Sequence, residues 1–377
     1  MGIEAKSMGS NPRNASGFFS VVEGEFICNP EVSIRDGWES NNMDPISQGA
    51  LGAIAAATLS KPVRHRWAVA VGWAGGMLAD ADIFIRSESD PLLNIEYHRH
   101  FSHSLVFIPL GGLICAGLLW IFLRRLIGFR ELLFYATAGY STAGLLDACT
   151  SYGTQLLWPF SDLRIAWSVI SIVDPVFTVT ILGLLAIGWI RSCQKWAWMG
   201  GIFVLVYLSI GALQSHRATS ALVELARNRG EERASRFTVK PSIGNLLVWR
   251  GIYEIEGDLQ VDAIRVSLLS GKIIVYEGER IRGVDIERLK GGLPESSVLR
   301  QDLERFNHFS AGYLSWHPNR PDVISDARYA MLPQSAIPLW GIEFDPDQPH
   351  RHAPFLNFRD ASPEVLEKLW DQIKGEQ

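Results

Sequence analysis

The stretch His98-Arg99-His100-Phe101-Ser102-His103-Ser104 leads directly into a long apolar run at residues 105–123 (LVFIPLGGLICAGLLWIFL). A run of about 20 mostly apolar residues is long enough to cross the hydrocarbon core of a bilayer. Imidazole groups beside hydrocarbon are costly unless a metal ion, a proton or a carboxylate interacts with them. This stretch therefore predicts a helical membrane protein with a polar site at one end of its helices.

Other apolar runs of similar composition lie at residues 67–85, 132–149, 165–190 and 196–213. A further run at residues 46–59 is short and rich in Gly and Ala, so it either crosses the membrane with close helix packing or re-enters it. We therefore expect a multi-helix membrane domain over residues 43–213. Residues 1–42 are polar and irregular, and we expect a disordered or wrongly assigned extension upstream of Met43, with a genuine flexible tail as the alternative.

The loops at residues 61–66, 124–130 and 191–195 carry the basic residues, and these loops follow alternate apolar runs. Since Lys and Arg concentrate in cytoplasmic loops, we expect these loops to lie in the cytoplasm. The opposite helix ends carry the acidic and imidazole residues, Asp80, Asp82, His98, His103 and Asp147, together with Gln48. Six crossings would place this cluster and the C-terminal domain on the non-cytoplasmic side of an inner membrane, whereas a re-entrant run at 46–59 would make the number of crossings odd.

Residues 214–377 read as a smaller soluble domain. Alternation of apolar and polar residues predicts strands over residues 246–255, 261–268, 272–277, 312–316 and 323–329. Residues 297–306 look helical, and Ser362 with Pro363 opens a final helix. The expected fold is thus an α-helical integral membrane domain followed by an α+β soluble domain with an antiparallel sheet. We interpret its histidines as surface residues: His308, His317, His350 and His352.

Composition excludes some classes of protein. The net charge is -5 and there is no basic tract, so nucleic acid is not an expected partner. The four cysteines contain no C-x-x-C pair, which argues against a disulfide framework or a cysteine zinc site. Asp174 precedes Pro175 within an apolar run, and it is either an intramembrane functional carboxylate or the cap of a helix that starts at Pro175.

In this order and spacing the motifs resemble the YdjM-type family of membrane-bound, metal-dependent hydrolases, from Met43 to about Trp340. The motifs are Met43-Asp44-Pro45-Ile46-Ser47-Gln48, Asp80-Ala81-Asp82, His98 to Ser104, residues 147–161 (DACTSYGTQLLWPFS) and Ile172-Val173-Asp174-Pro175. The resemblance implies a multi-helix membrane protein with a hydrolytic metal centre. The chain departs from its relatives at Gln48, Ala143 and Gly144, where some of them carry histidine, and at Ala79, where proline is common.

Carboxylates with two imidazoles suit a divalent ion such as Zn²⁺ or Mn²⁺. We expect the metal ligands to be Asp82, His98, His103 and Asp147. Such a metal lowers the pKa of bound water to about 7 and polarises a phosphoryl or acyl oxygen. Asp80 then serves as a general base or as a ligand to a second ion, Arg99 holds an anionic oxygen of the substrate, and His100 orients a ligand or faces solvent.

The main hypothesis is an integral-membrane hydrolase acting on a lipid-like ester or phosphoester at the bilayer surface. A second hypothesis is a non-catalytic membrane scaffold that binds a partner and has a structural metal site. A third is a transporter with Asp174 and the histidines on an ion path, against which the lack of a visible internal repeat counts.

Overall fold

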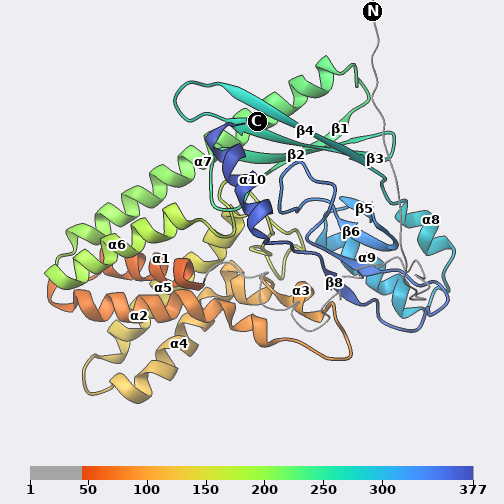
Figure 1. Ribbon diagram of the computed structural model, residues 1–377. Helices are drawn as coiled ribbons and strands as arrows, with labels where there is room; N and C mark the ends of the chain where they lie inside the picture. Colours follow the sequence, from red (N-terminus) through yellow and green to blue (C-terminus); the bar gives the residue numbers. More distant parts are fainter. Residues whose placement is uncertain (1–44, 377) are drawn as a thin grey trace, which may run out of the picture. The chain divides into compact units, whose positions relative to one another are not determined.

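The computed structural model describes residues 45–376, and Figure 1 shows their helices and strands. The predicted extension at residues 1–42 and the predicted start at Met43 lie outside these described residues. From Pro45 to Asn228 the chain is mostly helical, and from Ser235 to Lys374 it contains antiparallel sheets with flanking helices. The predicted order, a helical region followed by a domain with antiparallel strands, is therefore confirmed.

The longer helices of the N-terminal region are α1 (Pro45–Thr58), α2 (His65–Leu78), α4 (Ile108–Leu123), α5 (Phe129–Cys149), α6 (Pro175–Arg191) and α7 (Lys195–Asn228). Short helical segments connect them: η1 (Pro62–Arg64), η2 (Ala79–Phe84), α3 (Leu93–Tyr97), η3 (Phe101–His103) and η4 (Leu105–Phe107). Helix α1 contacts α2, α5, α6 and α7. Small residues allow this close packing, since a Cβ added at Gly52 would lie 2.5 Å from the carbonyl oxygen of Gly72.

By length and composition, two helical segments of the described chain are apolar enough to cross a membrane, Leu105–Leu123 and Lys195–Asn228. Only 22% of the most apolar window of each is buried, whereas the core helix of a soluble protein would be mostly buried. Helix α6 is apolar but has 17 residues. The run at residues 105–123 is thus helical as predicted.

The prediction of one continuous helix over residues 165–190 was wrong. Residues 165–174 contain no helix, and Ile165 forms an isolated β-bridge with Thr154. Helix α6 begins at Pro175, and the Asp174 carboxylate caps it by accepting a hydrogen bond from the Phe177 N–H at 3.0 Å. The capping interpretation of Asp174 is therefore confirmed, because this side chain is held by the helix end and by the Tyr207 hydroxyl at 2.8 Å.

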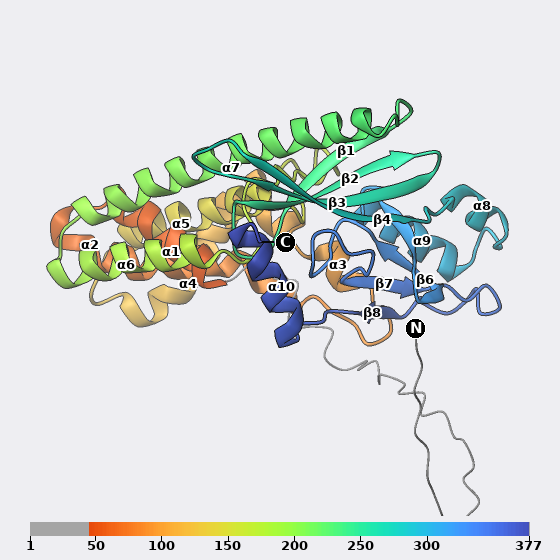
Figure 2. The same ribbon diagram turned by 45° about the horizontal axis from the view of Figure 1, so that its top comes forward.

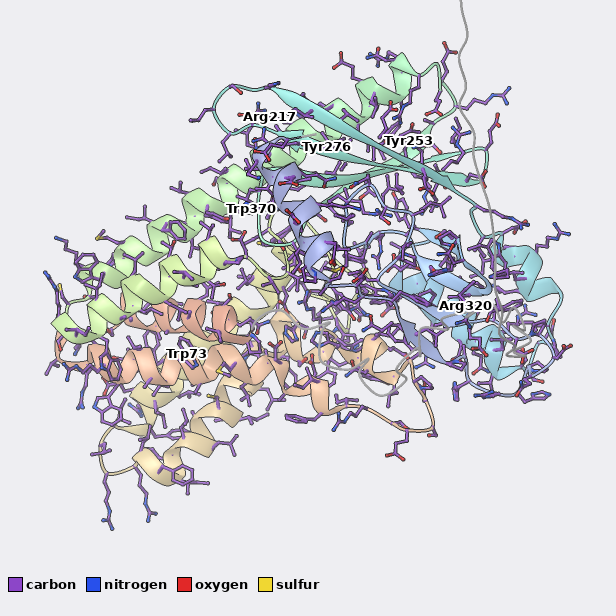
Figure 3. The ribbon with its side chains drawn as sticks, viewed as in Figure 1. Trp73, Arg217, Tyr253, Tyr276, Arg320 and Trp370 are labelled. Atoms are coloured by element: carbon purple, nitrogen blue, oxygen red, sulfur yellow. The ribbon has the colours of Figure 1, made fainter. Side chains whose placement is uncertain are left out.

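The C-terminal domain contains two antiparallel four-stranded sheets where one was expected. The first has the order β1 (Ser235–Pro241), β2 (Val248–Ile255), β3 (Asp258–Val266) and β4 (Ile273–Ile281), and the second β5 (Leu314–His317), β6 (Arg320–Asp326), β7 (Trp340–Glu343) and β8 (Phe355–Asn357). Helices α8 (Ile286–Gly291) and α9 (Val298–Phe309) separate the sheets along the chain, and α10 (Pro363–Lys374) ends the domain. Figure 3 places Tyr276 near α10, where its hydroxyl reaches the Gln372 carbonyl at 3.4 Å.

Helix α7 connects the two regions without a break. It passes through the domain boundary predicted at residues 213/214 and continues to Asn228 (Figure 2). Its second half packs Ala218 and Leu222 against Trp249 and Tyr253 of the first sheet. The transition from membrane-like to soluble composition therefore falls inside one helix.

The second sheet and α9 share a core with the loops at the helix ends. Leu92 and Tyr152 belong to the same buried cluster as Phe306, Phe309 and Trp340. The interpretation of His317 as a surface residue was wrong, because this side chain is buried and its ring lies 4.3 Å from that of Phe358.

Candidate metal centre

Acidic, imidazole and guanidinium side chains from four segments meet at one end of the N-terminal helices. Helix α1 contributes Gln48, η2 contributes Asp80 and Asp82, and α5 contributes Asp147. The loop between α3 and η4 contributes His98, Arg99 and His103. Each of these side chains is buried, none being more than 5% exposed. The structure thus brings together all six predicted site residues.

The backbone at Arg99 explains how two histidines five positions apart face the same cluster. Arg99 has a φ of 60°, a left-handed conformation that is uncommon for a residue with a side chain. This turn separates His98 from η3, which carries His103. Strained backbone of this kind concentrates at functional sites, so this turn points to a functional constraint on the loop that carries His98 and His103.

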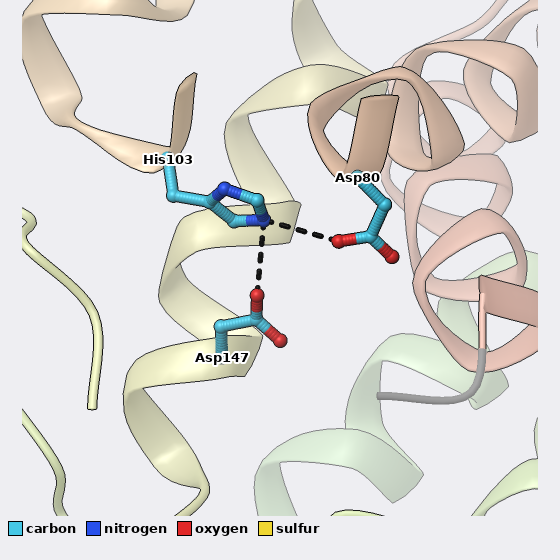
Figure 4. Close-up of side chains that lie close together, drawn as sticks. All are labelled: Asp80, His103 and Asp147. Carbon is cyan, nitrogen blue, oxygen red and sulfur yellow. Dashed lines mark hydrogen bonds and ion pairs between the residues drawn. The ribbon is translucent and has the colours of Figure 1, made fainter. Parts of the chain in front are cut away.

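His103 occupies the middle of the cluster (Figure 4). Its Nε2 lies 3.2 Å from Asp80 Oδ1 and 3.0 Å from Asp147 Oδ2, and its Nδ1 lies 3.1 Å from Asp82 Oδ2. Burial opposes a charge on this ring, but hydrogen bonds with Asp147, Asp80 and Asp82 raise the pKa of His103 well above its usual value. A metal ion bound at Nε2 would replace the proton that these carboxylates stabilise.

Asp82 interacts with the loop that carries His98, Arg99 and Ser102. Its Oδ1 lies 2.8 Å from His98 Nδ1, and its Oδ2 accepts hydrogen bonds from the Arg99 N–H at 2.9 Å and the Ser102 hydroxyl at 2.6 Å. The atoms best placed to share one ion are instead those of Asp80, His103 and Asp147, which lie within 4.8 Å of one another. Asp80, expected as a general base or as a ligand to a second ion, thus lies in the group that could share one ion, whereas Asp82, expected as a ligand, contacts the loop that carries His98.

Gln48 links the two carboxylates that flank His103. Its Nε2 donates to Asp80 Oδ1 at 3.1 Å and to Asp147 Oδ1 at 3.0 Å. The sequence placed Gln48 at the same helix ends as the acidic and imidazole residues, and as a departure from relatives with histidine, but it did not predict this bridging role. Gly144 has a steric reason to lack a side chain, because a Cβ there would overlap the carbonyl oxygen of His103.

Arg99 is fully buried beside Asp147. Its Nε lies 3.2 Å from Asp147 Oδ2, its Nη1 donates to Thr150 Oγ1 at 2.8 Å, and its guanidinium lies 5.0 Å from the centre of the Tyr152 ring. Its Nη2 has no hydrogen-bond partner among residues 45–376. Arg99 therefore neutralises part of the charge of Asp147 and keeps one donor available.

The donor set fits a divalent cation. Three carboxylates surround His103, and within residues 45–376 Arg99 is the one guanidinium that pairs with them, so carboxylates outnumber the arginine charge in this cluster. Within the described part of the chain, Asp80 Oδ2 and His98 Nε2 are buried without a hydrogen-bond partner. Buried polar atoms of native proteins are nearly always paired, so a bound ligand would account for these two acceptor atoms, and the Gln48 Oε1 atom is unpartnered in the same way.

Two cavities flank the cluster. One of about 200 Å³ reaches Asp82 and Ser102 and is otherwise lined largely by apolar groups, including Phe107, Ile114 and Tyr140. The other, of about 360 Å³, is lined by polar side chains that include His100. His100 packs 5.6 Å from the Trp158 ring, so it lines this second cavity and does not join the metal-binding geometry.

A second acidic group, absent from the sequence-based expectations, consists of Asp90, Asp302 and His352. The Arg305 guanidinium contacts Asp90 and Asp302 at 3.0 Å each, and it also contacts Glu96 at 2.7 Å. Since an arginine already occupies the position between these carboxylates, the group joins the helical region to α9 and is not a metal site of comparable quality.

Comparison with known proteins gives matches in the N-terminal region. Residues 43–218 match the family described as YdjM inner membrane protein. The uncharacterized protein YfhP of Bacillus subtilis is 24% identical over 142 residues, which cover 38% of this chain and 43% of YfhP. The inner membrane protein YbcI of Escherichia coli is 30% identical over 135 residues, which cover 34% of this chain and 75% of YbcI. The chain thus spans less than half the length of YfhP, and no solved structure matches it.

Proposed function

This chain belongs to the YdjM inner membrane protein family, and from that premise we propose that it is an inner-membrane, metal-dependent hydrolase of a lipid-like ester or phosphoester. The observation that carries the proposal is the convergence of Asp80, His103 and Asp147, with Asp80 Oδ2 buried and lacking a partner among the described residues. Perturbed and unpartnered ionisable groups beside a cavity are typical of catalytic sites.

Asp80, His103 and Asp147 would hold one divalent ion, for which Zn²⁺ and Mn²⁺ suit the mixture of carboxylate and imidazole ligands. When bound, such an ion supplies a water of lowered pKa and polarises the scissile oxygen. His98 has Nδ1 fixed by Asp82 at 2.8 Å, which directs its Nε2 to accept a proton or to bind the ion. Arg99 retains Nη2 as a donor for an anionic substrate oxygen.

The apolar cavity at Asp82 supports a lipid-like substrate. Ile114 of α4 and Tyr140 of α5 line it, and α4 exposes large apolar side chains that include Leu110, Leu113 and Leu118. A contiguous apolar surface of this kind fits contact with lipid, and it would let an acyl chain reach the polar cluster from the bilayer.

We further propose a multi-pass arrangement with the cluster and the C-terminal domain on the non-cytoplasmic side. The basic loops at residues 61–66, 124–130 and 191–195 support this orientation. With 14 residues, α1 would be about 21 Å long, shorter than the hydrocarbon core of about 30 Å. Its contacts with four other helices support a buried central position.

The test measures metal content and hydrolysis on the same preparations of full-length protein in detergent. We expect about one divalent ion per chain. We also expect hydrolysis of nitrophenyl carboxylic esters or nitrophenyl phosphodiesters, at a rate that increases with the length of the acyl or alkyl chain. Asp80→Asn should lose both metal and turnover, while His350→Ala, which changes an exposed histidine, should retain both. Equal turnover in Asp80→Asn and the native protein would refute the proposal.

The complete burial of Arg99, His103 and Asp147 favours a second candidate, a structural metal centre in a membrane scaffold. A catalytic metal keeps an open ligand position, whereas a structural one is closed. A structural metal would raise the thermal unfolding temperature of the protein, and the protein would hydrolyse no ester or phosphoester. The two readouts of the experiment above, metal content and turnover, separate the candidates.

A further inference from the structure

A third cavity, of about 250 Å³, lies between the helix-end loops and the C-terminal domain. Ser151 and residues 171–173 form one side, and residues from β1, β2 and the segment after β6 form the other. None of the six predicted site residues lines it. It is therefore distinct from the metal cluster.

The charged side chains lining this cavity are all cationic: Lys240, Arg250, Arg328 and Arg359. The first three are buried, with exposures of 8%, 3% and 4%. Arg328 pairs with Asp326 at 2.7 Å, a residue that does not line the cavity. Buried charges are normally paired, so the question for this cavity is what compensates the two other buried cations, Lys240 and Arg250.

Lys240 and Arg250 form no ion pair within the described chain. Lys240 Nζ donates only to the Ser168 hydroxyl, at 3.0 Å. Arg250 uses Nε and Nη1 for the backbone carbonyls of Ala327, Pro333 and Ser335, at 2.7–2.9 Å. The protein thus fixes the geometry of the Arg250 guanidinium, while the carboxylates that act on its charge, Asp326 and Asp262, form no ion pair with it.

The unpartnered polar atoms on the cavity wall are donors. Arg250 Nη2 and Trp340 Nε1 are buried and have no hydrogen-bond partner among residues 45–376. Neither group can accept a hydrogen bond, so a ligand that pairs with them must supply acceptor atoms. The ammonium of Lys240 adds further donors to the same wall.

The remaining wall is apolar. Ile172, Val173, Met331 and Leu339 line it, together with the indole of Trp340. Small-molecule sites commonly combine apolar walls with a few convergent polar groups that fix one end of the ligand. A ligand that fits this wall has an anionic group at one end and an apolar group at the other.

We propose that this cavity binds a phosphoryl group attached to an apolar moiety. A phosphomonoester carries a charge of about -1.5 to -2 at pH 7 and three acceptor oxygens, which matches two cations without an ion pair and additional donors better than a single carboxylate does. The binding site does not depend on the metal cluster or on hydrolysis.

The ionisation of Lys240 and Arg250 is consistent with this assignment. Burial, and next the positive charge of Arg328, lower the pKa of Lys240 to about 7. Burial likewise lowers the pKa of Arg250 to about 9. A bound anion would raise both pKa values and offset the cost of burying these charges.

The experiment titrates full-length protein in detergent with inorganic phosphate, dihexanoyl phosphatidic acid and hexanoate by calorimetry. We expect the phosphatidic acid to bind more tightly than hexanoate by tenfold or more. Equal affinity for phosphate and phosphatidic acid would assign the site to free phosphoryl groups, because the acyl chains would then contribute nothing. Binding of neither phosphate compound, or hexanoate binding as tight as phosphatidic acid, would overturn the proposal.

Matched variants locate the binding. Lys240→Gln removes one buried cation and should weaken phosphate binding by about 10- to 100-fold, as expected for one charged hydrogen bond. Lys272→Gln makes the same change at an exposed position and should leave the affinity unchanged. Trp340→Phe removes one donor without removing the ring, and it tests the site should Lys240→Gln fail to fold. Asp80→Asn should bind phosphate normally, which separates this site from the metal cluster. Unchanged affinity in both Lys240→Gln and Trp340→Phe would show that the anion binds elsewhere.

Discussion

Lys240 should make the stability of this protein depend on pH in an unusual direction. Its pKa in the folded protein is about 7, against an ordinary value of 10.5. Between these values the unfolded chain holds a proton that the folded chain releases. Stability therefore rises with pH from about 7 to about 10.5, and the cost of burying this lysine is fully present below about pH 7.

The size of the effect follows from the same two values. Each pKa unit corresponds to about 1.4 kcal/mol, so the full cost is roughly 5 kcal/mol. Raising the pH from 7 to 9 should recover roughly 2 kcal/mol of it. Lys240→Gln removes the ionisable group and should remove this part of the pH dependence.

The assay is denaturant unfolding of native protein and Lys240→Gln in the same detergent at pH 7 and pH 9, without added phosphate. The quantity to compare is the difference in unfolding free energy between the two proteins, because the contributions of the other titrating groups are the same in both and cancel. We expect Lys240→Gln to be the more stable protein at pH 7, with its advantage reduced by roughly 2 kcal/mol at pH 9. An advantage that stays constant between the two pH values would refute the reasoning.

Three further predictions concern the metal cluster and the membrane. His103→Ala should reduce bound divalent metal at least tenfold, because it removes the central nitrogen, while His350→Ala should leave the metal content unchanged when both are measured by mass spectrometry. Gly144→Ala should lower stability by about 1–3 kcal/mol and reduce metal content, because the added Cβ overlaps the His103 carbonyl; unaltered thermal unfolding would contradict this. In intact cells, a membrane-impermeant thiol reagent should label Asp162→Cys and not Arg125→Cys, and the reverse pattern would invert the proposed topology.

Hydropathy predicted helices where apolar residues form long runs, and it failed where apolar residues are buried for another reason. Residues 105–123 are a helix, as expected. Residues 165–174 are apolar because Val169 and Ile170 pack against the helices, and the carbonyl of Val169 lies directly over Gly211. The apolar composition of residues 165–174 thus indicates a buried irregular segment. Hydrophobic periodicity cannot distinguish such a segment from a short helix.

The site was predictable as a set of residues but not as an arrangement. The clustering of Asp80, Asp82, His98, His103 and Asp147 at helix ends was visible in the sequence. The choice between Asp80 and Asp82 as the group nearest His103 Nε2 depends on the 3₁₀ geometry of η2, which the spacing of two aspartates does not encode. The cationic cavity left no local signal at all, since its residues come from positions 240, 250, 328 and 359 and meet only in the folded chain.

Because α7 is one continuous helix, it fixes how far the first sheet is rotated about the helix axis relative to the helix bundle. Its 34 residues amount to a rod of about 50 Å, one half packed on helices and the other on strands. Inserting one residue near its middle would turn the sheet by about 100° around the rod and advance it by about 1.5 Å. Seven inserted residues would nearly restore the phase while lengthening the rod by about 10 Å. Because α7 runs without a break from the helix bundle to the first sheet, the orientation of that sheet is coupled to that of the helix bundle.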